Sequence, residues 1–350
     1  MVQIPKVASG SIQHGFRTLP VWLAALALVW IFQIFFSANM NPYYYLILIY
    51  AGVNIVLAVS LNLVTGFTGQ FSMGHAGFMS VGGYAAAYLS TTLMAQYPTL
   101  FADPVMGKVL LVPLLIVGGL AASVAGYIVG LPSLRLKGDY LAIVTLGFGE
   151  IIRVIILNIK AVGGAAGMPA IPRLSNFGLV YTVAILTVFV VWRLVNSAHG
   201  RAFLSVREDE IAAESMGVNT TRAKVRAFVI GAFFAGVAGA LFAHLLTYLN
   251  PATFNFNKSF EIIIMIVLGG LGSITGSIIA AVLLTIIPEA LRPLQEITGL
   301  DFRMVIYSLL LIILMLTRPN GLLGTKEFTE LMPAAWRKKL SGGQDDGAKA

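Results

Sequence analysis

The sequence predicts an all-α membrane protein, a polytopic helical bundle of about ten transmembrane segments, some of them broken by glycine or re-entrant. Hydrophobic residues make up 58% of the 350 residues and charged residues only 11%, whereas soluble domains carry roughly 25% charged residues. Long apolar runs alternate with short polar loops along most of the chain. The charged residues gather in a few of these loops, which is typical of loops that lie outside the lipid.

The net charge of +8 is best explained by topology, because loops rich in Lys and Arg lie in the cytoplasm. No basic stripe has aromatic residues interleaved with it, so no nucleic-acid partner is expected. Cysteine is absent, which excludes disulfides, thiolate chemistry and cysteine-based zinc sites. The four histidines do not follow a metal-ligand spacing, and no metal site is expected.

The chain begins with a polar head, residues 1–19, followed by the apolar run 20–36. The residues after this run make a poor cleavage site, which favours an uncleaved anchor with a cytoplasmic head over a signal peptide. The transmembrane domain is expected to cover residues 20–317. Further spans are expected at residues 43–64, 109–131, 140–157 and 177–192, and an Ala-rich stretch continues from the glycine-rich segment to about residue 95.

A glycine-rich stretch, residues 65–78, follows the second span and contains Gln70, Ser72 and His75. Polar side chains at membrane depth are costly unless they are buried in protein or face water. The stretch is therefore interpreted in two ways, as a segment that lines the substrate path or as a tight seam between helices made of small residues.

Glu150 and Arg153 lie three residues apart within the span 140–157, so they share a helix face. A carboxylate inside a membrane is a functional candidate, and a proton relay is one interpretation. The adjacent arginine favours the other interpretation, a structural ion pair near the end of the span.

A charged island, residues 193–226, separates the span 177–192 from the span 227–246 and is expected to form a cytoplasmic coupling loop. In its middle the sequence predicts a short amphipathic helix that contains Ala212 and Ala213 and ends at Gly217. Asn219 and Thr220 offer an N-cap for the next helix. Two spans carry small residues at a spacing of four, which predicts close helix packing; these are Gly118, Ala122, Gly126 and Gly130, and Gly231, Ala235, Gly239 and Ala243.

Two half-length apolar pieces, residues 260–268 and 274–287, flank Gly269, Gly270 and Gly272. They are interpreted as two tilted spans or as one discontinuous, re-entrant helix, and such breaks point to the substrate path in transporters. The glycine-rich stretch around Gln70 is a candidate mate for this break. A last span is expected at residues 302–316, followed by a polar cytoplasmic tail, residues 318–350, expected to be disordered.

No Walker loop occurs in the sequence, and no nucleophile motif or ligand cluster is present. Catalysis by this chain alone is therefore not expected.

Three separated segments, residues 66–78, 137–147 and 207–217, resemble the LivM-type permeases of branched-chain amino-acid ABC importers. The resemblance covers roughly residues 43–325. It implies a multi-pass protein of a bacterial inner membrane, with both termini cytoplasmic, that pairs with a second, homologous permease. It also implies two cytoplasmic ATPase subunits, which bind ATP and Mg²⁺, so that this chain needs no cofactor. A periplasmic binding protein would deliver leucine, isoleucine or valine.

In this family a cytoplasmic helix with a Glu-Ala-Ala-x-x-x-Gly pattern docks on the ATPase. Ala212, Ala213 and Gly217 match this pattern, but Ile211 stands at the glutamate position, beside Glu210. Either Glu210 or Glu214 is left to take the role of that carboxylate. The candidate coupling residues are Arg207, Glu208, Glu210, Ala212, Ala213, Glu214 and Gly217, and the candidate path residues are Gln70, Ser72, His75, Glu150, Gly269, Gly270 and Gly272.

Two other functions stay open from the sequence. Related permeases with these motifs carry urea or short amides, since specificity resides largely in the soluble receptor. An ion-coupled secondary carrier that works alone is a different class, and it would use Glu150 as its titrating group.

Overall fold

The computed structural model describes residues 12–292 and, beyond them, residues 308–309, 312–313, 316–318, 321–324 and 327. Regular structure in these residues is helical, apart from one antiparallel bridge between Met168 and Leu249. The α-helices are α1 (Ile12–Asn39), α2 (Pro42–Thr65), α3 (His75–Gln96), α4 (Pro98–Ala102), α5 (Pro104–Ser133), α6 (Asp139–Asn158), α7 (Phe177–Val195), α8 (Ala198–Glu208), α9 (Glu210–Ser215), α10 (Thr220–Leu246), α11 (Phe256–Gly269) and α12 (Ile274–Ala290). Three 3-10 turns accompany them, η1 (Lys160–Val162), η2 (Gly164–Ala166) and η3 (Pro251–Phe254).

Five helices of the described chain are long and apolar enough to cross a membrane, which confirms an all-α membrane protein; their spans are Pro42–Thr65, Met106–Ser133, Asp139–Asn158, Phe177–Val195 and Thr220–Leu246. Shorter apolar helices lie at Trp22–Phe36 and Ile274–Ala290. The expected total of about ten segments stays a prediction. Most of the expected last span, residues 302–316, lies outside the described residues, as do most of the expected tail and residues 1–11 of the head.

Side-chain caps fix where several of these helices begin. Asn41 accepts a hydrogen bond from the backbone N–H of Tyr43 at 3.0 Å, directly before Pro42 opens α2. Asn176 caps α7 and Asn255 caps α11 in the same way. An N-cap oxygen satisfies a backbone N–H that the helix itself cannot pair, so these short motifs define the boundaries locally.

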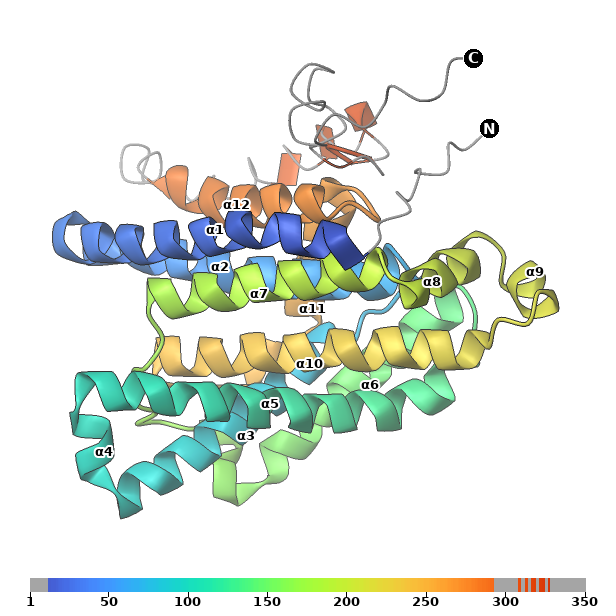
Figure 1. Cartoon of the computed structure of the whole chain (residues 1–350). Coiled ribbons are helices and arrows are strands. Elements are labelled where there is room, and N and C mark those ends of the chain that lie inside the picture. The colour runs from blue at the N-terminus through green and yellow to red at the C-terminus, as the bar shows by residue number, and fades with distance from the viewer. Residues whose placement is uncertain are drawn as a thin grey trace.

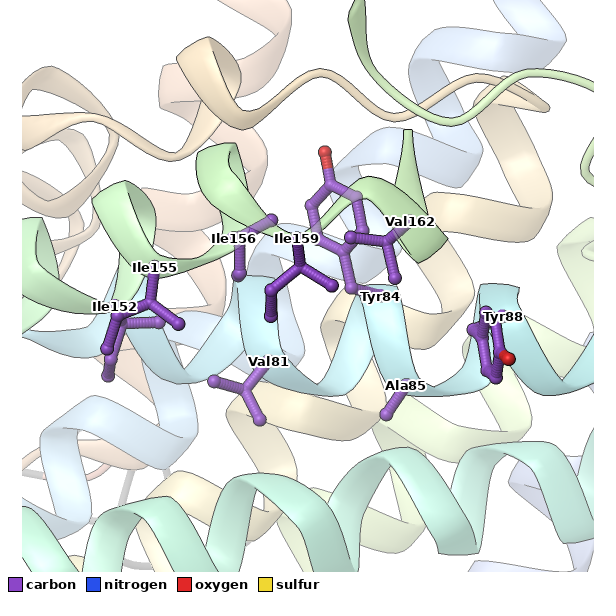
Figure 2. Close-up of a pocket in the computed structure, with 9 residues that line it drawn as sticks. All are labelled: Val81, Tyr84, Ala85, Tyr88, Ile152, Ile155, Ile156, Ile159 and Val162. Carbon is purple, nitrogen blue, oxygen red and sulfur yellow. The ribbon is translucent and has the colours of Figure 1, made fainter. Parts of the chain in front are cut away.

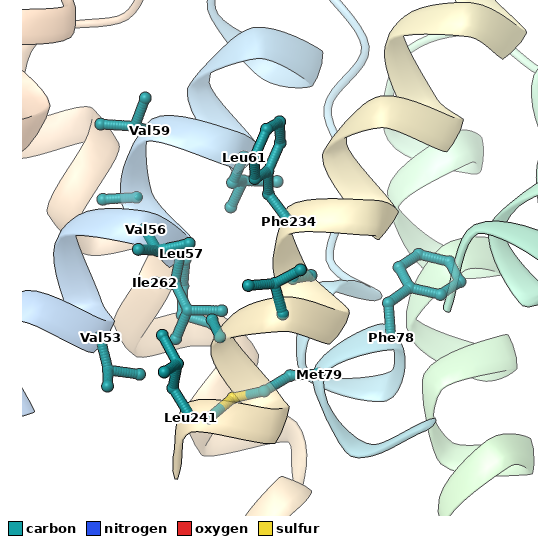
Figure 3. Packing of buried hydrophobic residues seen from close by; sticks show 14 of the residues in the cluster. Val53, Val56, Leu57, Val59, Leu61, Phe78, Met79, Phe234, Leu241 and Ile262 are labelled. Carbon is teal, nitrogen blue, oxygen red and sulfur yellow. The ribbon is translucent and has the colours of Figure 1, made fainter. Parts of the chain in front are cut away.

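The core of the bundle lies where α2, α3, α10 and α11 meet (Figure 3). Glycines allow the backbones to approach closely there: a Cβ at Gly82 of α3 would lie 2.2 Å from the Cα of Gly236, and one at Gly239 would lie 1.9 Å from the carbonyl oxygen of Met79. The small residues of α5 face α10 as well, since a Cβ at Gly126 would meet Ala232 at 2.5 Å. The predicted close packing at the small-residue columns is confirmed.

One end of the bundle carries α8 and α9, and α9 projects beyond the long helices (Figure 1). The start of α1 lies at the same end. Lys137, in the loop between α5 and α6, also reaches this end, because its Nζ lies 3.5 Å from Glu210 of α9. Lys137 and the basic residues of the segment 193–226 thus lie at one end of the bundle. The cytoplasmic position of this end stays a prediction of the positive-inside rule.

Candidate functional site

The candidate coupling site is an elbow, defined as residues 196–219, in which α8 and α9 link α7 to α10. Asp209 joins the two short helices: its Oδ1 accepts hydrogen bonds from the N–H groups of Ile211 and Ala212 at 2.9 and 3.0 Å. Gly217 ends the second one with φ +85°, a left-handed conformation that glycine adopts without strain. The predicted helix end at Gly217 is confirmed, and so is the cap, because Asn219 accepts from the N–H of Arg222 at 2.9 Å.

Helix α8, by contrast, was not predicted from the sequence. It begins at a Ser197 cap and buries Phe203 and Val206 against the bundle. The Ser197 cap and the three-residue spacing of Phe203 and Val206 could have predicted this helix. The many charged residues around them favoured the interpretation as a loop.

Glu210 fastens the tip of the elbow to the bundle. Its carboxylate lies 2.7 Å from Nζ of Lys224 on α10 and 3.5 Å from Nζ of Lys137. Burial favours the neutral carboxyl, but the hydrogen bonds and charges of the two lysines outweigh it and lower the pKa of Glu210 from its usual 4.5. Glu214, in comparison, is exposed. Of the two candidates for the glutamate of the Glu-Ala-Ala-x-x-x-Gly pattern, Glu210 is therefore paired within the chain, and Glu214 is exposed on the surface.

The tip of the elbow exposes apolar side chains. Ile211 is 71% exposed and Met216 is 85% exposed. Ala212 and Gly217 are also exposed, whereas Ala213 is buried beneath them. Large apolar side chains held outside a bundle on a capped, charged element are typical of a surface that binds another protein.

The root of the elbow contacts both glycine-rich segments of the chain. Arg207 donates from Nη1 to the carbonyl oxygen of Gly66 at 3.1 Å and pairs through Nη2 with Glu208 at 2.7 Å. A Cβ at Gly69 would lie 3.2 Å from the Cα of Arg207, and one at Gly272 would lie 2.8 Å from its Nη1. The elbow is therefore in direct contact with both glycine-rich segments.

The two glycine-rich segments also meet each other, and we call the contact between residues 66–74 and 269–273 the glycine junction. A Cβ at Gly66 would lie 2.4 Å from the backbone nitrogen of Gly272. Asn62 of α2 bridges the junction: its Oδ1 accepts from the N–H of Gly272 at 2.9 Å, and its Nδ2 donates to Ser273 O and Ser277 Oγ, both at 2.8 Å. The two breaks are therefore in contact, and their correspondence in two halves of the chain stays a prediction.

The structure also locates the candidate path residues. Gln70 and Ser72 are buried in the non-helical segment before α3, and His75 Nε2 lies 2.8 Å from the hydroxyl of Ser60 on α2. Gly269, Gly270 and Gly272 form the break between α11 and α12. Glu150 lies apart on α6, where its Oε2 pairs with Nε of Arg153 at 2.7 Å.

A further buried polar cluster escaped the sequence analysis. Lys258, at the start of α11, donates from Nζ to Tyr50 Oη at 2.8 Å and pairs with Glu261 at 3.0 Å. Asn54 of α2 donates to Thr285 of α12 at 2.8 Å. The signal was present, because Lys258 and Glu261 stand three apart beside an apolar run, just as Glu150 and Arg153 do.

A surface groove of about 390 Å³ lies between α3 and α6 (Figure 2). Its lining is apolar apart from Tyr84 and Tyr88, and it includes Ile152 and Ile155. No charged side chain lines it, so it offers no opposite charge to the ionised groups of an amino acid. Within the described chain, no group of three or more His, Cys, Asp or Glu side chains is placed to hold a metal ion.

A family model described as "Branched-chain amino acid transport system / permease component" matches residues 43–315. The high-affinity branched-chain amino acid transport system permease protein LivM of Escherichia coli (strain K12) is 36% identical over 338 residues, covering 87% of this chain and 74% of that protein. Its counterpart from Salmonella typhimurium is 37% identical, with 77% and 67% covered.

The permease protein LivH of Escherichia coli (strain K12) is 37% identical over 142 residues, which cover 41% of this chain and 44% of LivH. No solved structure matches the chain. The residues that the family model matches include the elbow and the glycine junction, and the two LivM proteins match most of the sequence. The chain therefore belongs to the family of permease components of branched-chain amino acid transport systems.

Proposed function

We propose that the chain is one of two permease subunits of an ATP-driven ABC importer that carries leucine, isoleucine and valine across a bacterial inner membrane. A periplasmic binding protein delivers the amino acid on one side. Two ATPase subunits, which bind ATP and Mg²⁺, dock on the cytoplasmic elbows of the two permeases. Membership of the permease family and the relatives' names support the substrate class.

The observation that carries the proposal is the exposed apolar tip of a rigidly built elbow. Ile211 and Met216 project from a helix held by Asp209 and by the Glu210–Lys224 ion pair. Burying one such side chain contributes about 1.5–3 kcal/mol, which corresponds to a change in docking affinity of roughly 10- to 100-fold. A partner that grips this tip would move the elbow as a rigid body.

The elbow is also connected to the part of the bundle that a transporter must rearrange. Arg207 contacts Gly66 and lies against Gly272. Since glycine backbones and discontinuous helices permit local rearrangement, a displacement of α8 would be passed to α2 and to the α11–α12 break. This chain of contacts supports energy transfer from a cytoplasmic ATPase rather than from an ion gradient.

The transport test uses proteoliposomes that contain this chain, the second permease, the two ATPases and the binding protein. Uptake of labelled leucine and labelled urea is measured with and without internal ATP. ATP-dependent leucine uptake that urea does not share is the expected result. ATP-dependent uptake of urea without uptake of leucine would show that the substrate is urea and not a branched-chain amino acid. Uptake by this chain alone, driven by an ion gradient, would refute the proposal.

The docking test compares Ile211→Asp with His199→Asp. Both place a new carboxylate at an exposed position of the elbow, but only the first lies at the apolar tip. Ile211→Asp should lower ATPase binding and leucine uptake by at least about tenfold, and His199→Asp should change neither. Equal behaviour of the two variants would show that the tip does not bind the ATPase.

A further inference from the structure

The side of the chain formed by α6 and α11 is poorly covered. Only 22% of the α6 span is buried, compared with 28% of α7, 39% of α5, 78% of α10 and 83% of α2. One side of α6 packs on α3, where Gly149 and Ile152 face Gly77. The other side carries Ile151, which is 52% exposed. Helices α6 and α11 both contact α3 and also contact each other, so their outer sides form one surface.

This surface carries charges within the spans. Glu150 is paired with Arg153, yet their side chains remain 36% and 27% exposed. Glu150 stands more than two turns from either end of α6 (Asp139–Asn158), farther from the end of the span than the sequence interpretation placed it. In a membrane-spanning α6 it lies at the depth of the hydrocarbon. Lipid tails offer such a pair neither water nor a hydrogen-bonding partner, so exposure to lipid there would be costly.

Helix α11 repeats the arrangement. Lys258 is almost fully covered, whereas the side chain of its partner Glu261 is 36% exposed. The start of α11 lies inside the bundle, because Ser259 accepts from the N–H of Ala76 at 3.3 Å and Lys258 reaches Tyr50 of α2. In both ion pairs the carboxylate faces outward more than its cation does. Each of the two helices therefore exposes a carboxylate.

By contrast, the exposed side of α5 is apolar. Val124 is 60% exposed and Ile128 is 64% exposed, and no charged residue occurs in the sequence between Lys108 and Arg135. Such a surface suits lipid without further cover. The chain thus presents one side that lipid can cover and one that it cannot cover without great cost.

We propose that the second, homologous permease covers the α6–α11 side, so that Glu150 and Glu261 face a water-containing space between the two permeases. The proposal rests on the proposed function, which supplies the second permease. Gly147 of α6 is exposed, and a Cβ built on it would meet no atom within 4 Å, so a partner backbone has room to approach closely there. The substrate path then runs along this side rather than through the apolar groove between α3 and α6.

Photo-crosslinking in the assembled complex tests the contact. A benzophenone amino acid replaces Ile151 or Phe260 on the proposed side, and Val124 or Ile128 on the apolar side as matched exposed controls. The two permeases carry different tags, so an adduct of both is identified directly. Adducts from Ile151 and Phe260, with none from the α5 positions, are expected. Adducts from the α5 positions alone, or from none of the four, would overturn the proposal.

Thiol labelling tests whether the space between the two permeases contains water. The chain has no native cysteine, so each introduced thiol is the only one in the chain. In the complex assembled from cysteine-free partner subunits, Ile151→Cys should react with a charged methanethiosulfonate at least about tenfold faster than Ile128→Cys, since lipid excludes the charged reagent. Equal rates would refute the water-containing space. ATP-dependent leucine uptake is measured on the same preparations and on the unsubstituted complex. Intact uptake with the wrong labelling pattern refutes only this inference, whereas absent uptake by the unsubstituted complex refutes the proposed function.

Discussion

Replacing Asn62 with alanine tests whether its side chain holds the glycine junction together. The side chain is fully buried, and the substitution removes its three hydrogen bonds to residues around the α11–α12 break. Ser273 O and Ser277 Oγ still have a hydrogen-bond partner after the substitution, because the Ser277 hydroxyl donates to Ser273 O at 3.0 Å. The N–H of Gly272 loses the acceptor that Asn62 supplies.

The magnitude follows from these contacts. One buried donor left unpaired costs about 1–3 kcal/mol, and each of the two other hydrogen bonds contributes about 0.6 kcal/mol in membrane proteins. Asn62→Ala should therefore lower the free energy of unfolding by about 2–4 kcal/mol. Asn158→Ala is the matched control, because Asn158 is exposed and bonds only within its own helix, to Val154 O at 2.7 Å; its loss should stay within about 0.5 kcal/mol.

The assay is unfolding of the detergent-solubilised chain by added sodium dodecyl sulfate, followed by far-UV circular dichroism. A double-mutant cycle with Ser277→Ala should show coupling with Asn62→Ala, because their side chains are hydrogen-bonded at 2.8 Å. A loss below about 1 kcal/mol, or a loss equal to that of Asn158→Ala, would show that the amide does not hold the junction.

Three further predictions concern the packing and the elbow. Gly82→Ala should destabilise the chain by about 1–3 kcal/mol, because its Cβ would fall 2.2 Å from the facing backbone of α10, whereas Gly147→Ala has open space and should be neutral in the same unfolding assay. Because the pKa of Glu210 is lowered in the folded chain, its stabilisation of the elbow should be present above its usual pKa and be lost as the pH falls through the lowered value. Hydrogen-exchange protection of the elbow in wild type and Glu210→Gln should therefore differ at neutral pH and converge in acid; a difference that persists in acid would contradict the ion-pair explanation. Gly217→Ala should lower that protection by about 1–2 kcal/mol, the usual cost of a left-handed residue with a side chain, although no neighbour lies within 4 Å of the new Cβ. Unchanged protection would show that the elbow relaxes around this position.

The sequence by itself determined the class of the protein and the features that depend on neighbouring residues. Hydropathy is a property of each segment, so the membrane-spanning helices could be located from composition alone. The end of α9 at Gly217 and the cap at Asn219 were predictable because a cap involves residues only two or three positions apart. The small-residue columns likewise gave the close packing of α5 and α10, because a spacing of four repeats on one helix face.

Only the tertiary structure decided which distant segments meet. Asn62 and Gly272 are separated by 210 positions, and nothing local in either one indicates the other. The sequence likewise contained Lys258 and Glu261, but not the depth of α11 in the bundle or the partner Tyr50. The rotation of α6, which leaves Glu150 half-exposed, depends on how Gly149 packs against α3. These features arise from long-range packing, in which each helix buries the face that fits its neighbours best, and the sequence of one helix does not specify its neighbours.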